Sequence, residues 1–327
     1  MLALLCLAGP GLSTRAGAAE PDPDEGSIGI RLLEAPTNRR DDPRARRYVV
    51  DHLPPGETIK RQLLVTNRTD ERRRIDVYPA AATLEESRFV FGEGRAANEL
   101  TSWISLDRTT FELGPQAETR VRATVRVPPA ASAGERYGVI WASTTSLPRP
   151  GGQVTQTHRV GVRMYLDIGP GGEPASDFTI GDLIPARSPQ GEPSVAIGVT
   201  NTGGRALDLT GKVALTEGPA GTRAGPFDVV QGTTLAPGQS GQVTARFPAE
   251  LSNGPWTLRV DLESGLVKKD ATGRIEFPDP GETGKPATFL SRLATWWTVA
   301  IAAAGVLVVA GLTTLARRSR RRILVGR

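Results

Sequence analysis

The sequence predicts an all-β protein in which two tandem immunoglobulin-like β-sandwich domains are followed by a single transmembrane helix. Three observations lead to this prediction. Short apolar–polar alternations separated by Gly, Pro and Asn turns fill residues 27–278, and no window there holds a helical period of useful length. The two halves of this region repeat one plan of strands and turns. An uncharged apolar run then occupies residues 296–316.

The first half shows the clearest strand patterns. In residues 119–127, valine and alanine alternate with arginine and threonine, which is the period of a strand with one buried and one solvated face. Residues 160–168 alternate in the same way, and residues 137–142 are apolar on both faces, as a central strand would be. Residues 36–47 are rich in Arg, Asp and Pro and are expected to form a loop. We therefore predict the first sandwich over residues 27–168.

The second half follows a Gly- and Pro-rich stretch, residues 169–176, that is predicted to link the domains. Residues 198–203 read Gly-Val-Thr-Asn-Thr-Gly and match Leu-Val-Thr-Asn-Arg-Thr at 64–69. Each half thus has a strand, an asparagine turn and a further strand. We predict the second sandwich over residues 177–278 and a stalk over 279–295.

The apolar run is predicted to cross a membrane. At about 1.5 Å of helical rise per residue it covers the roughly 30 Å hydrocarbon core of a bilayer. Tryptophans precede it and a basic tail, residues 317–327, follows it. The predicted anchor residues are Trp296, Trp297, Arg317, Arg318, Arg320, Arg321 and Arg322. Their order predicts a single-pass plasma-membrane protein with extracytoplasmic domains and a cytoplasmic C-terminus; the alternative is a buried helix of a soluble domain.

The formal net charge of +5 is explained by the tail. The tail holds six arginines and no acidic residue, so the +5 of the whole chain becomes −1 for residues 1–316. A near-neutral ectodomain argues against nucleic acid as a partner.

The N-terminus has the features of an export signal. A short apolar run leads to an Ala-Gly-Ala site, so residues 1–19 are predicted as a signal peptide and residues 20–26 as a flexible leader. Cys6 is the single cysteine and would be removed with the signal. Disulfides and thiol chemistry are therefore not expected in the mature protein.

No arrangement of residues predicts catalysis, a metal or a cofactor. His52 and His158 are distant in sequence and have no neighbour at metal-ligand spacing. No G-x-S-x-G elbow is present, and residues 92–97 match the dinucleotide fingerprint by letter alone. The candidate ligand-binding residues are Trp103 and Tyr165, whose rings could stack on sugars if they were exposed. Tyr165 falls on the polar side of its strand, with Arg163 and Asp167, and cross-strand packing on a half-exposed sheet explains it as well. Trp141 shares a face with Tyr137 and Val139 and is predicted to lie in the core.

Several segments of the first half resemble the WxL-interacting protein family of Gram-positive bacteria. The segments are residues 53–57 before 63–70, residues 75–81, and residues 127–129 leading to 134–140. The order of signal peptide, two β-sandwiches, one transmembrane helix and basic tail is similar too. The resemblance implies that the first domain binds peptidoglycan and that the second binds a partner or a host surface.

We therefore expect a non-enzymatic, membrane-anchored cell-envelope protein that binds peptidoglycan or another wall polymer, another cell-surface protein, or both. The alternative is a structural spacer or assembly subunit that presents another surface protein without binding glycan. An envelope enzyme with an unrecognised site is the third hypothesis. The expected partners are a membrane together with a wall polymer or surface protein, and no cofactor is expected.

Overall fold

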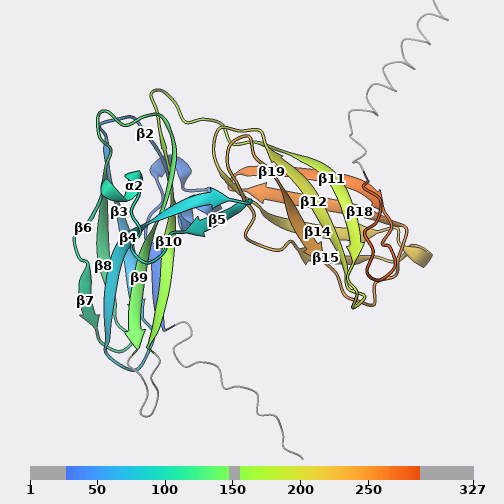
Figure 1. Cartoon of the computed structure of the whole chain (residues 1–327), viewed down its shortest axis with the longest axis horizontal. Helices are drawn as coiled ribbons and strands as arrows, with labels where there is room; N and C mark the ends of the chain where they lie inside the picture. The colour runs from blue at the N-terminus through green and yellow to red at the C-terminus, as the bar shows by residue number, and fades with distance from the viewer. Residues whose placement is uncertain (1–26, 147–154, 288–327) are drawn as a thin grey trace, which may run out of the picture.

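The computed structural model describes residues 27–146 and 155–287, which form an all-β protein of two sandwich-like domains (Figure 1). The strands of the first domain are β1 (Ile28–Leu32), β2 (Val49–Leu53), β3 (Thr58–Asn67), β4 (Arg73–Glu85), β5 (Arg88–Phe91), β6 (Ile104–Leu106), β7 (Thr110–Leu113), β8 (Glu118–Arg126), β9 (Gly134–Ser146) and β10 (Gln156–Ile168). The strands of the second domain are β11 (Phe178–Arg187), β12 (Pro193–Asn201), β13 (Leu207–Asp208), β14 (Thr210–Thr216), β15 (Ala224–Asp228), β16 (Thr234–Leu235), β17 (Ser240–Arg246), β18 (Trp256–Ser264) and β19 (Val267–Ile275). The helical segments are η1 (Thr37–Arg39), α1 (Pro43–Arg47), α2 (Glu99–Ser102) and η2 (Pro219–Gly221).

Two sheets face each other in the first domain. One has the order β1-β3-β8-β6 and the other the order β2-β10-β9-β4-β5, with β7 also paired to β4. The alternation predicted for residues 119–127 is confirmed in β8, whose apolar residues are buried and whose arginines are exposed. On β10, Val162, Met164 and Leu166 point into the same core. The residues between them therefore lie on the outward face of the second sheet.

Residues 36–47 differ from the expected loop, because they form η1 and α1. Asp42 caps α1 by accepting a hydrogen bond from the Arg44 N–H at 2.9 Å. Pro43 occupies the first turn, where its missing N–H has no partner to lose. This helical segment separates β1 from β2, and the two strands consequently join different sheets.

The second domain contains three sheets, with the orders β11-β12-β17, β13-β16 and β15-β14-β18-β19. Its core is formed by apolar residues from all of the longer strands, among them Phe178, Val213 and Leu258. No strand of β1–β10 pairs with a strand of β11–β19 within the described ranges. The chain passes between the domains through the stretch between β10 and β11, where the sequence predicts a linker.

The repeated plan of the two halves is visible in two equivalent turns. Asn67, at the end of β3, donates its side-chain amide to main-chain carbonyls at 2.7 and 2.8 Å. Asn201, at the end of β12, does the same at 2.8 and 3.0 Å. Both side chains are buried, and each ties separate chain segments together behind its strand. The match between residues 64–69 and 198–203 therefore reflects a shared local structure.

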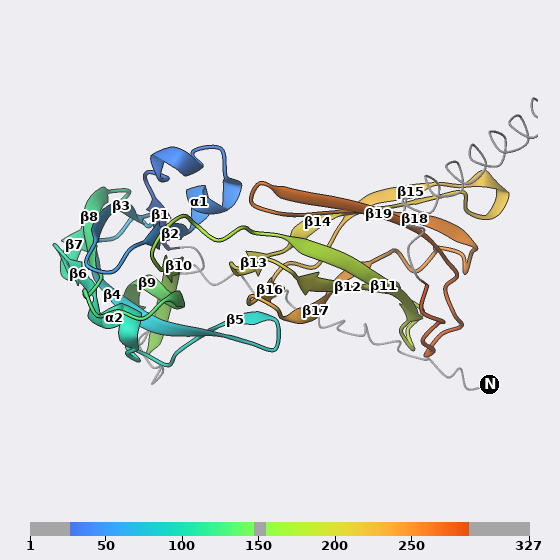
Figure 2. The same ribbon diagram turned by 90° about the horizontal axis from the view of Figure 1, so that it is seen from above.

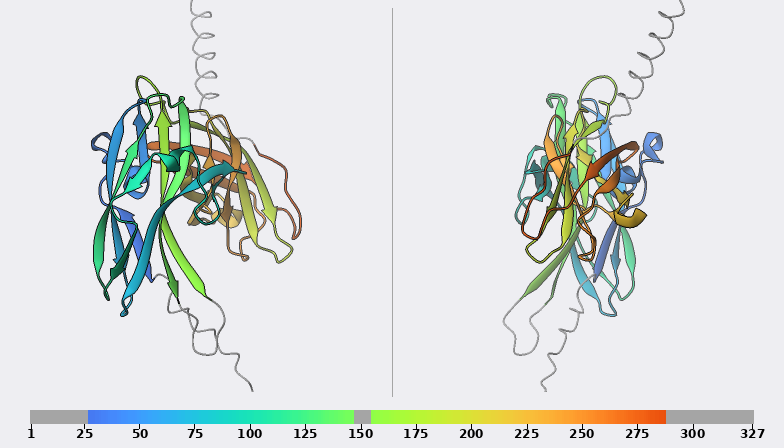
Figure 3. Two further views of the ribbon diagram at one scale, coloured as in Figure 1. Left: turned by 60° about the vertical axis from the view of Figure 1, so that its left-hand side comes forward. Right: turned by 90° about the vertical axis from the view of Figure 1, so that its right-hand side faces the viewer.

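The β4–β5 hairpin reaches from the first domain to the second (Figures 1 and 2). At its tip Glu86 and Ser87 have positive φ angles of 47° and 61°, a conformation that is costly for residues other than glycine. The carbonyl of Ser87 accepts a hydrogen bond from the Thr234 N–H at 2.8 Å. The two domains lie at an angle to each other, with their long directions clearly different (Figure 3).

No helix within the described part of the chain is long and apolar enough to cross a membrane. Several predicted segments lie outside the described residues. These are the signal peptide 1–19, the leader 20–26, the run 296–316 with Trp296 and Trp297, and the basic tail 317–327.

Candidate functional site

Strand β10 divides into two halves that differ in their neighbours. Its C-terminal half, Met164–Ile168, pairs with β9 on one side and in parallel with β2 on the other. Its N-terminal half, residues 156–163, pairs with β9 alone among the described residues. We call residues 156–163 the open edge. In a strand with one free side, every second residue points its N–H and C=O outward, so the open edge offers unpaired main-chain groups.

Other long sheet edges are protected in ways that the open edge is not. The outer side of β19 carries three consecutive charged residues, Lys268, Lys269 and Asp270, which discourage pairing with a further strand. The outer side of β11 is partly covered by isolated bridges from Leu183 to Ala287 and from Ala186 to Thr283. The open edge has no run of three charged residues and no such bridges among the described residues, and it is therefore a candidate for pairing with another chain.

The outward face next to the open edge holds aromatic rings covered by arginines. The Trp141 ring on β9 contacts Phe91 at a centroid distance of 4.8 Å, and the Arg159 guanidinium lies 4.8 Å from the centre of the same ring. The Arg95 guanidinium, from the segment after β5, lies 4.1 Å from the centre of the Tyr78 ring on β4. Tyr78 is the register partner of Trp141. We call Tyr78, Arg95, Trp141 and Arg159 the arginine–aromatic strip.

Gly161 allows the indole of Trp141 to lie across β10. Gly161 is the register partner of Trp141. A Cβ at Gly161 would lie only 2.7 Å from the indole Cε3 and 2.6 Å from Val139 Cγ2, closer than such atoms approach in proteins. The absence of a side chain at Gly161 therefore brings the indole up to the open edge.

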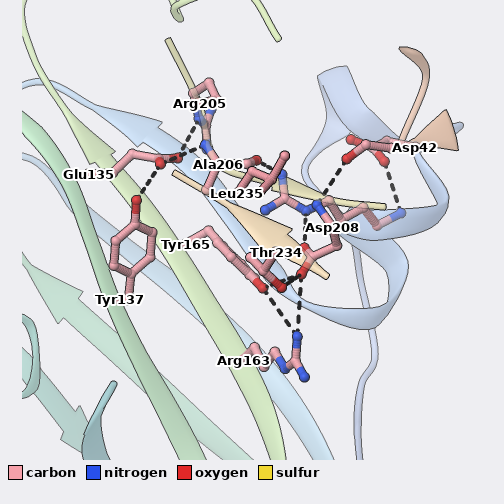
Figure 4. Close-up of polar contacts among 12 residues, drawn as sticks. Asp42, Glu135, Tyr137, Arg163, Tyr165, Arg205, Ala206, Asp208, Thr234 and Leu235 are labelled. Atoms are coloured by element: carbon pink, nitrogen blue, oxygen red, sulfur yellow. Dashed lines mark hydrogen bonds and ion pairs between the residues drawn. The ribbon is translucent and has the colours of Figure 1, made fainter. Parts of the chain in front are cut away.

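The outward face of the C-terminal half is covered by the second domain (Figure 4). Asp208, on β13, accepts a hydrogen bond from the Tyr165 hydroxyl at 2.6 Å and another from Arg44 Nε at 2.5 Å. Thr234, on β16, donates to the same carboxylate at 2.9 Å, and Arg163 pairs with it at 3.3 Å. One carboxylate thus connects β10, α1 and the second domain.

The protonation states around Asp208 follow from burial and charge. Burial and the Asp208 carboxylate both disfavour tyrosinate, so the pKa of the Tyr165 hydroxyl is raised. Burial would lower the pKa of Arg44, but the combined attraction of Asp208, Tyr165 and Glu135 outweighs burial and the pKa is raised. Tyr165 is therefore a donor and Arg44 a cation at neutral pH.

Arg205 forms the second polar centre between the domains, and its side chain is 1% exposed. Its Nε donates to Glu135 at 3.1 Å, and its Nη2 donates to the carbonyl of Asp51 at 3.2 Å. It also pairs with Glu173 of the linker. The Tyr137 hydroxyl donates to Glu135 at 2.8 Å, and burial together with that carboxylate raises the pKa of Tyr137. The contacts of Asp208 and Arg205 together make up the interdomain polar network.

The linker is held by a histidine. His52, on β2, places Nδ1 2.6 Å from a carboxylate oxygen of Asp167 and Nε2 3.2 Å from the carbonyl of Gly171. The N–H of Gly169 donates to the carbonyl of Leu53 at 3.1 Å. These contacts fix the start of the linker against β2, and together with the interdomain polar network they hold the two domains in one arrangement.

The two candidate ligand-binding residues lie in different places, and neither presents a ring face. Tyr165 is 0% exposed and lies under the second domain, where it packs against Phe89 at a centroid distance of 5.1 Å. Trp103 is 7% exposed and belongs to the core of the first sandwich, with Arg136 over its ring at 5.6 Å. The exposure that sugar stacking requires is absent at both rings. Tyr165 lies on the polar face of its strand, as predicted, but a protein domain covers that face instead of solvent.

Sequence analysis missed the residues that matter most at this site. Asp208 and Arg205 lie in a short segment after the Asn201 turn, where no periodicity singles them out. Arg159 and Gly161 lie on the polar side of β10, where alternation alone predicts contact with solvent. Trp141 was assigned to the core, and it is 6% exposed. A glycine opposite a tryptophan could have indicated the arginine–aromatic strip. That pairing can be recognised only when the register between β9 and β10 is known.

Within residues 27–146 and 155–287, no group of three or more His, Cys, Asp or Glu residues could hold a metal ion. The site consists instead of main-chain donors and acceptors, aromatic rings and guanidinium groups. Such an arrangement can pair with a strand or bind an anionic group.

Comparisons with known proteins find structural likeness only. No protein-family model and no curated protein sequence matches the chain. Similar solved structures include the Escherichia coli chaperone DraB, with 13% identity, a TM-score of 0.36, and coverage of 74% of this chain and 94% of that one. The Pseudomonas aeruginosa CupB2 chaperone has 11% identity and a TM-score of 0.35, covering 71% and 99%. The Acinetobacter baumannii CsuC–CsuE chaperone–tip adhesion subunit complex has 11% identity and a TM-score of 0.34, covering 68% and 94%.

These findings correct the family assignment made from the sequence. Several of the similar structures are chaperones, among them one of class 5 fimbriae and one of archaic chaperone–usher pili, whereas no WxL-interacting protein is among those compared and no family model supports the predicted family. The soft motifs that carried the resemblance, a Pro-Gly turn, a strand and an Asn turn, are features of many β-sandwiches. The prediction of a membrane-anchored, peptidoglycan-binding protein of a Gram-positive plasma membrane is corrected with it, because that prediction depended on the family. The predicted run 296–316 lies outside the described residues, among which no helix could cross a membrane.

Proposed function

We propose that this protein is a non-enzymatic, extracytoplasmic binding protein that takes up an extended segment of another surface protein as an added strand on the open edge of β10. The observation that carries the proposal is the missing neighbour of residues 156–163 in a strand whose next five residues have one. Strand addition uses such free main-chain groups for affinity and the alternating side chains for specificity. The signal-like sequence of residues 1–19 supports export.

The interdomain polar network supports the same function, because it fixes the open edge in space. The second domain holds the C-terminal half of β10 through Tyr165, and it holds the adjoining end of the open edge through Arg163. A strand that is rigid at one end keeps its free end extended before a partner arrives. Less conformational entropy is then lost on binding, which favours affinity.

A selected peptide tests the proposal. A library of random peptides of about twelve residues, enough to span the open edge at roughly 3.3 Å per residue, is selected against the full chain. The tightest peptide is then synthesised in two forms, with alternate amides N-methylated in one register or the other. Only one edge of an added strand faces β10, so one methylated form should lose binding and the other should keep it.

Amide hydrogen exchange of the complex locates the peptide. We expect new protection at residues 156–163 and no change at Met164–Ile168, which already have partners on both sides. Two results would count against the proposal: equal loss of binding in both methylated forms, or protection confined to another edge such as β19.

A further inference from the structure

The outward face beside the open edge carries arginines that lack acidic partners. Arg159 lies on β10 itself, Arg74 on β4, and Arg95 in the segment after β5, and all three are exposed. None of them forms an ion pair with Asp or Glu within residues 27–146 and 155–287, whereas Arg163 on the same face of β10 pairs with Asp208. Asp76, an outward carboxylate of β4, accepts a hydrogen bond from the Thr110 hydroxyl at 2.6 Å and opposes the three arginines with one negative charge. The face therefore has cations in excess.

Stacking keeps two of these cations in place without using their hydrogen-bond donors. The Arg159 guanidinium lies 4.8 Å from the centre of the Trp141 ring and that of Arg95 4.1 Å from the centre of the Tyr78 ring. A guanidinium that rests on an aromatic face still presents its N–H groups at its rim, in a fork that matches a carboxylate. The arginine–aromatic strip is thus pre-organised for an acidic group.

A further donor in the strip has no acceptor. Trp141 Nε1 is buried and makes no hydrogen bond within the described part of the chain. A buried N–H without an acceptor is costly. Together with the three arginines, it adds a donor beside the open edge, so donors and cations dominate this face.

The opposite face of the open edge carries Gln156 and His158 at its start and is apolar at Val160 and Val162. Val160 is half-buried and packs against the core of the first sandwich, as does Ile30 on the neighbouring β1. Side chains of an added strand alternate between the two faces. Residues of the partner that point inward would meet Val160 and the edge of the core, and residues that point outward would meet Arg159.

We propose that the partner segment alternates apolar and acidic residues, with its acidic side chains on the side of Arg159. This inference rests on the proposed strand addition and adds the chemistry of the partner. Arg159 is on the strand next to the partner, whereas Arg95 covers β4, two strands further in at about 4.8 Å per strand. Arg159 should therefore contribute more to the preference than Arg95.

The test uses three synthetic peptides of about ten residues, which span the open edge. They alternate valine with glutamate, with threonine or with lysine. Binding to the full chain is measured by fluorescence anisotropy of the labelled peptides, and its position by amide exchange at residues 156–163. Exposed ion pairs are individually weak, so we expect the glutamate peptide to bind about three- to tenfold more tightly than the threonine peptide and the lysine peptide to bind most weakly.

Variants separate this charge preference from strand addition itself. Arg159→Ala should remove most of the glutamate preference, Arg95→Ala less of it, and Arg120→Ala none, because Arg120 is an exposed arginine on β8 of the other sheet. Binding of the threonine peptide should be unchanged in all three variants. Raising the salt from about 0.1 M to about 1 M shortens the Debye length from roughly 10 to roughly 3 Å and should abolish the preference.

Each other outcome has one meaning. Equal binding of all three peptides with protection at residues 156–163 overturns the acidic preference and leaves strand addition in place. No protection of those residues by any peptide overturns both proposals. Dextran sulfate that displaces the glutamate peptide but not the threonine peptide is expected from charge alone. If the glutamate peptide binds tightly but does not protect the amides of residues 156–163, the face binds polyanions and not strands.

Discussion

The two halves of β10 share a neighbour on one side and differ in their other surroundings. Residues 156–163 and Met164–Ile168 both pair with β9. The second half has β2 along its other side and the second domain over its outward face, whereas the first half lacks β2 and contacts the second domain only at its last residue, Arg163. One strand therefore joins the two domains at one end and offers a free edge at the other. A rigid strand that ends in an unpaired edge is a suitable support for binding an extended chain.

Amide exchange gives the largest contrast between the halves. In the free protein, outward amides of the open edge should exchange through local fluctuations, while amides of Met164–Ile168 should open only with global unfolding. With a global stability of about 5–15 kcal/mol, the two sets should differ by at least a thousandfold in protection. Hydrogen exchange followed by NMR measures this directly. Equal protection in both halves would mean that another segment covers the open edge.

Removing the buried cation between the domains should have the next largest effect. Arg205→Ala leaves Glu135 and Glu173 without their buried partner, which typically costs about 3–5 kcal/mol. Urea unfolding of the variant measures the loss. Arg120→Ala is the control, and as an exposed substitution it should change stability by no more than about 0.5 kcal/mol. A small effect of Arg205→Ala would show that the domains are held mainly by apolar contacts.

Alkaline pH should lower the free energy of unfolding, because Tyr137 and Tyr165 are held protonated in the folded protein. The pKa values of Tyr137 and Tyr165 are raised above 10, the value expected in the unfolded chain. Above pH 10 the unfolded state therefore binds fewer protons than the folded state, and stability falls as pH rises. The loss should reach roughly 3 kcal/mol at about pH 11, since each of the two groups contributes about 1.4 kcal/mol per pH unit.

Absorbance at the tyrosinate band tests this prediction. Of the four tyrosines in the chain, Tyr137 and Tyr165 should ionise only together with unfolding. If both titrate while the domains remain folded, the contacts to Glu135 and Asp208 contribute little in solution.

Tyr165→Phe should give the smallest of these effects. The substitution keeps the ring that packs against Phe89 and removes the hydroxyl that donates to Asp208. Asp208 retains Arg44 and Thr234 as partners, so we expect a loss near the lower limit for hydrogen bonds to charged groups, about 1.5 kcal/mol. Thermal melts report the change. Peptide binding at the open edge should persist, and its loss would show that the two halves of β10 are coupled.

The sequence by itself determined the local structure of this protein. The period-two pattern in residues 119–127 and 160–168 correctly indicated strands and the residues that face the core, because side-chain direction in a strand depends only on position. The asparagine turns at Asn67 and Asn201 were visible because the repeated residues form the same local hydrogen bonds.

The tertiary structure alone decided what covers each face and edge. Tyr165 was predicted on a polar, half-exposed face, and it is buried because Asp208 and Thr234, far along the chain, satisfy the polar groups of that face. The open edge exists because β2 borders only the last five residues of β10, and periodicity carries no information on how far a neighbouring strand extends. Alternation specifies two faces, whereas the contacts that each face makes depend on segments that only folding brings together.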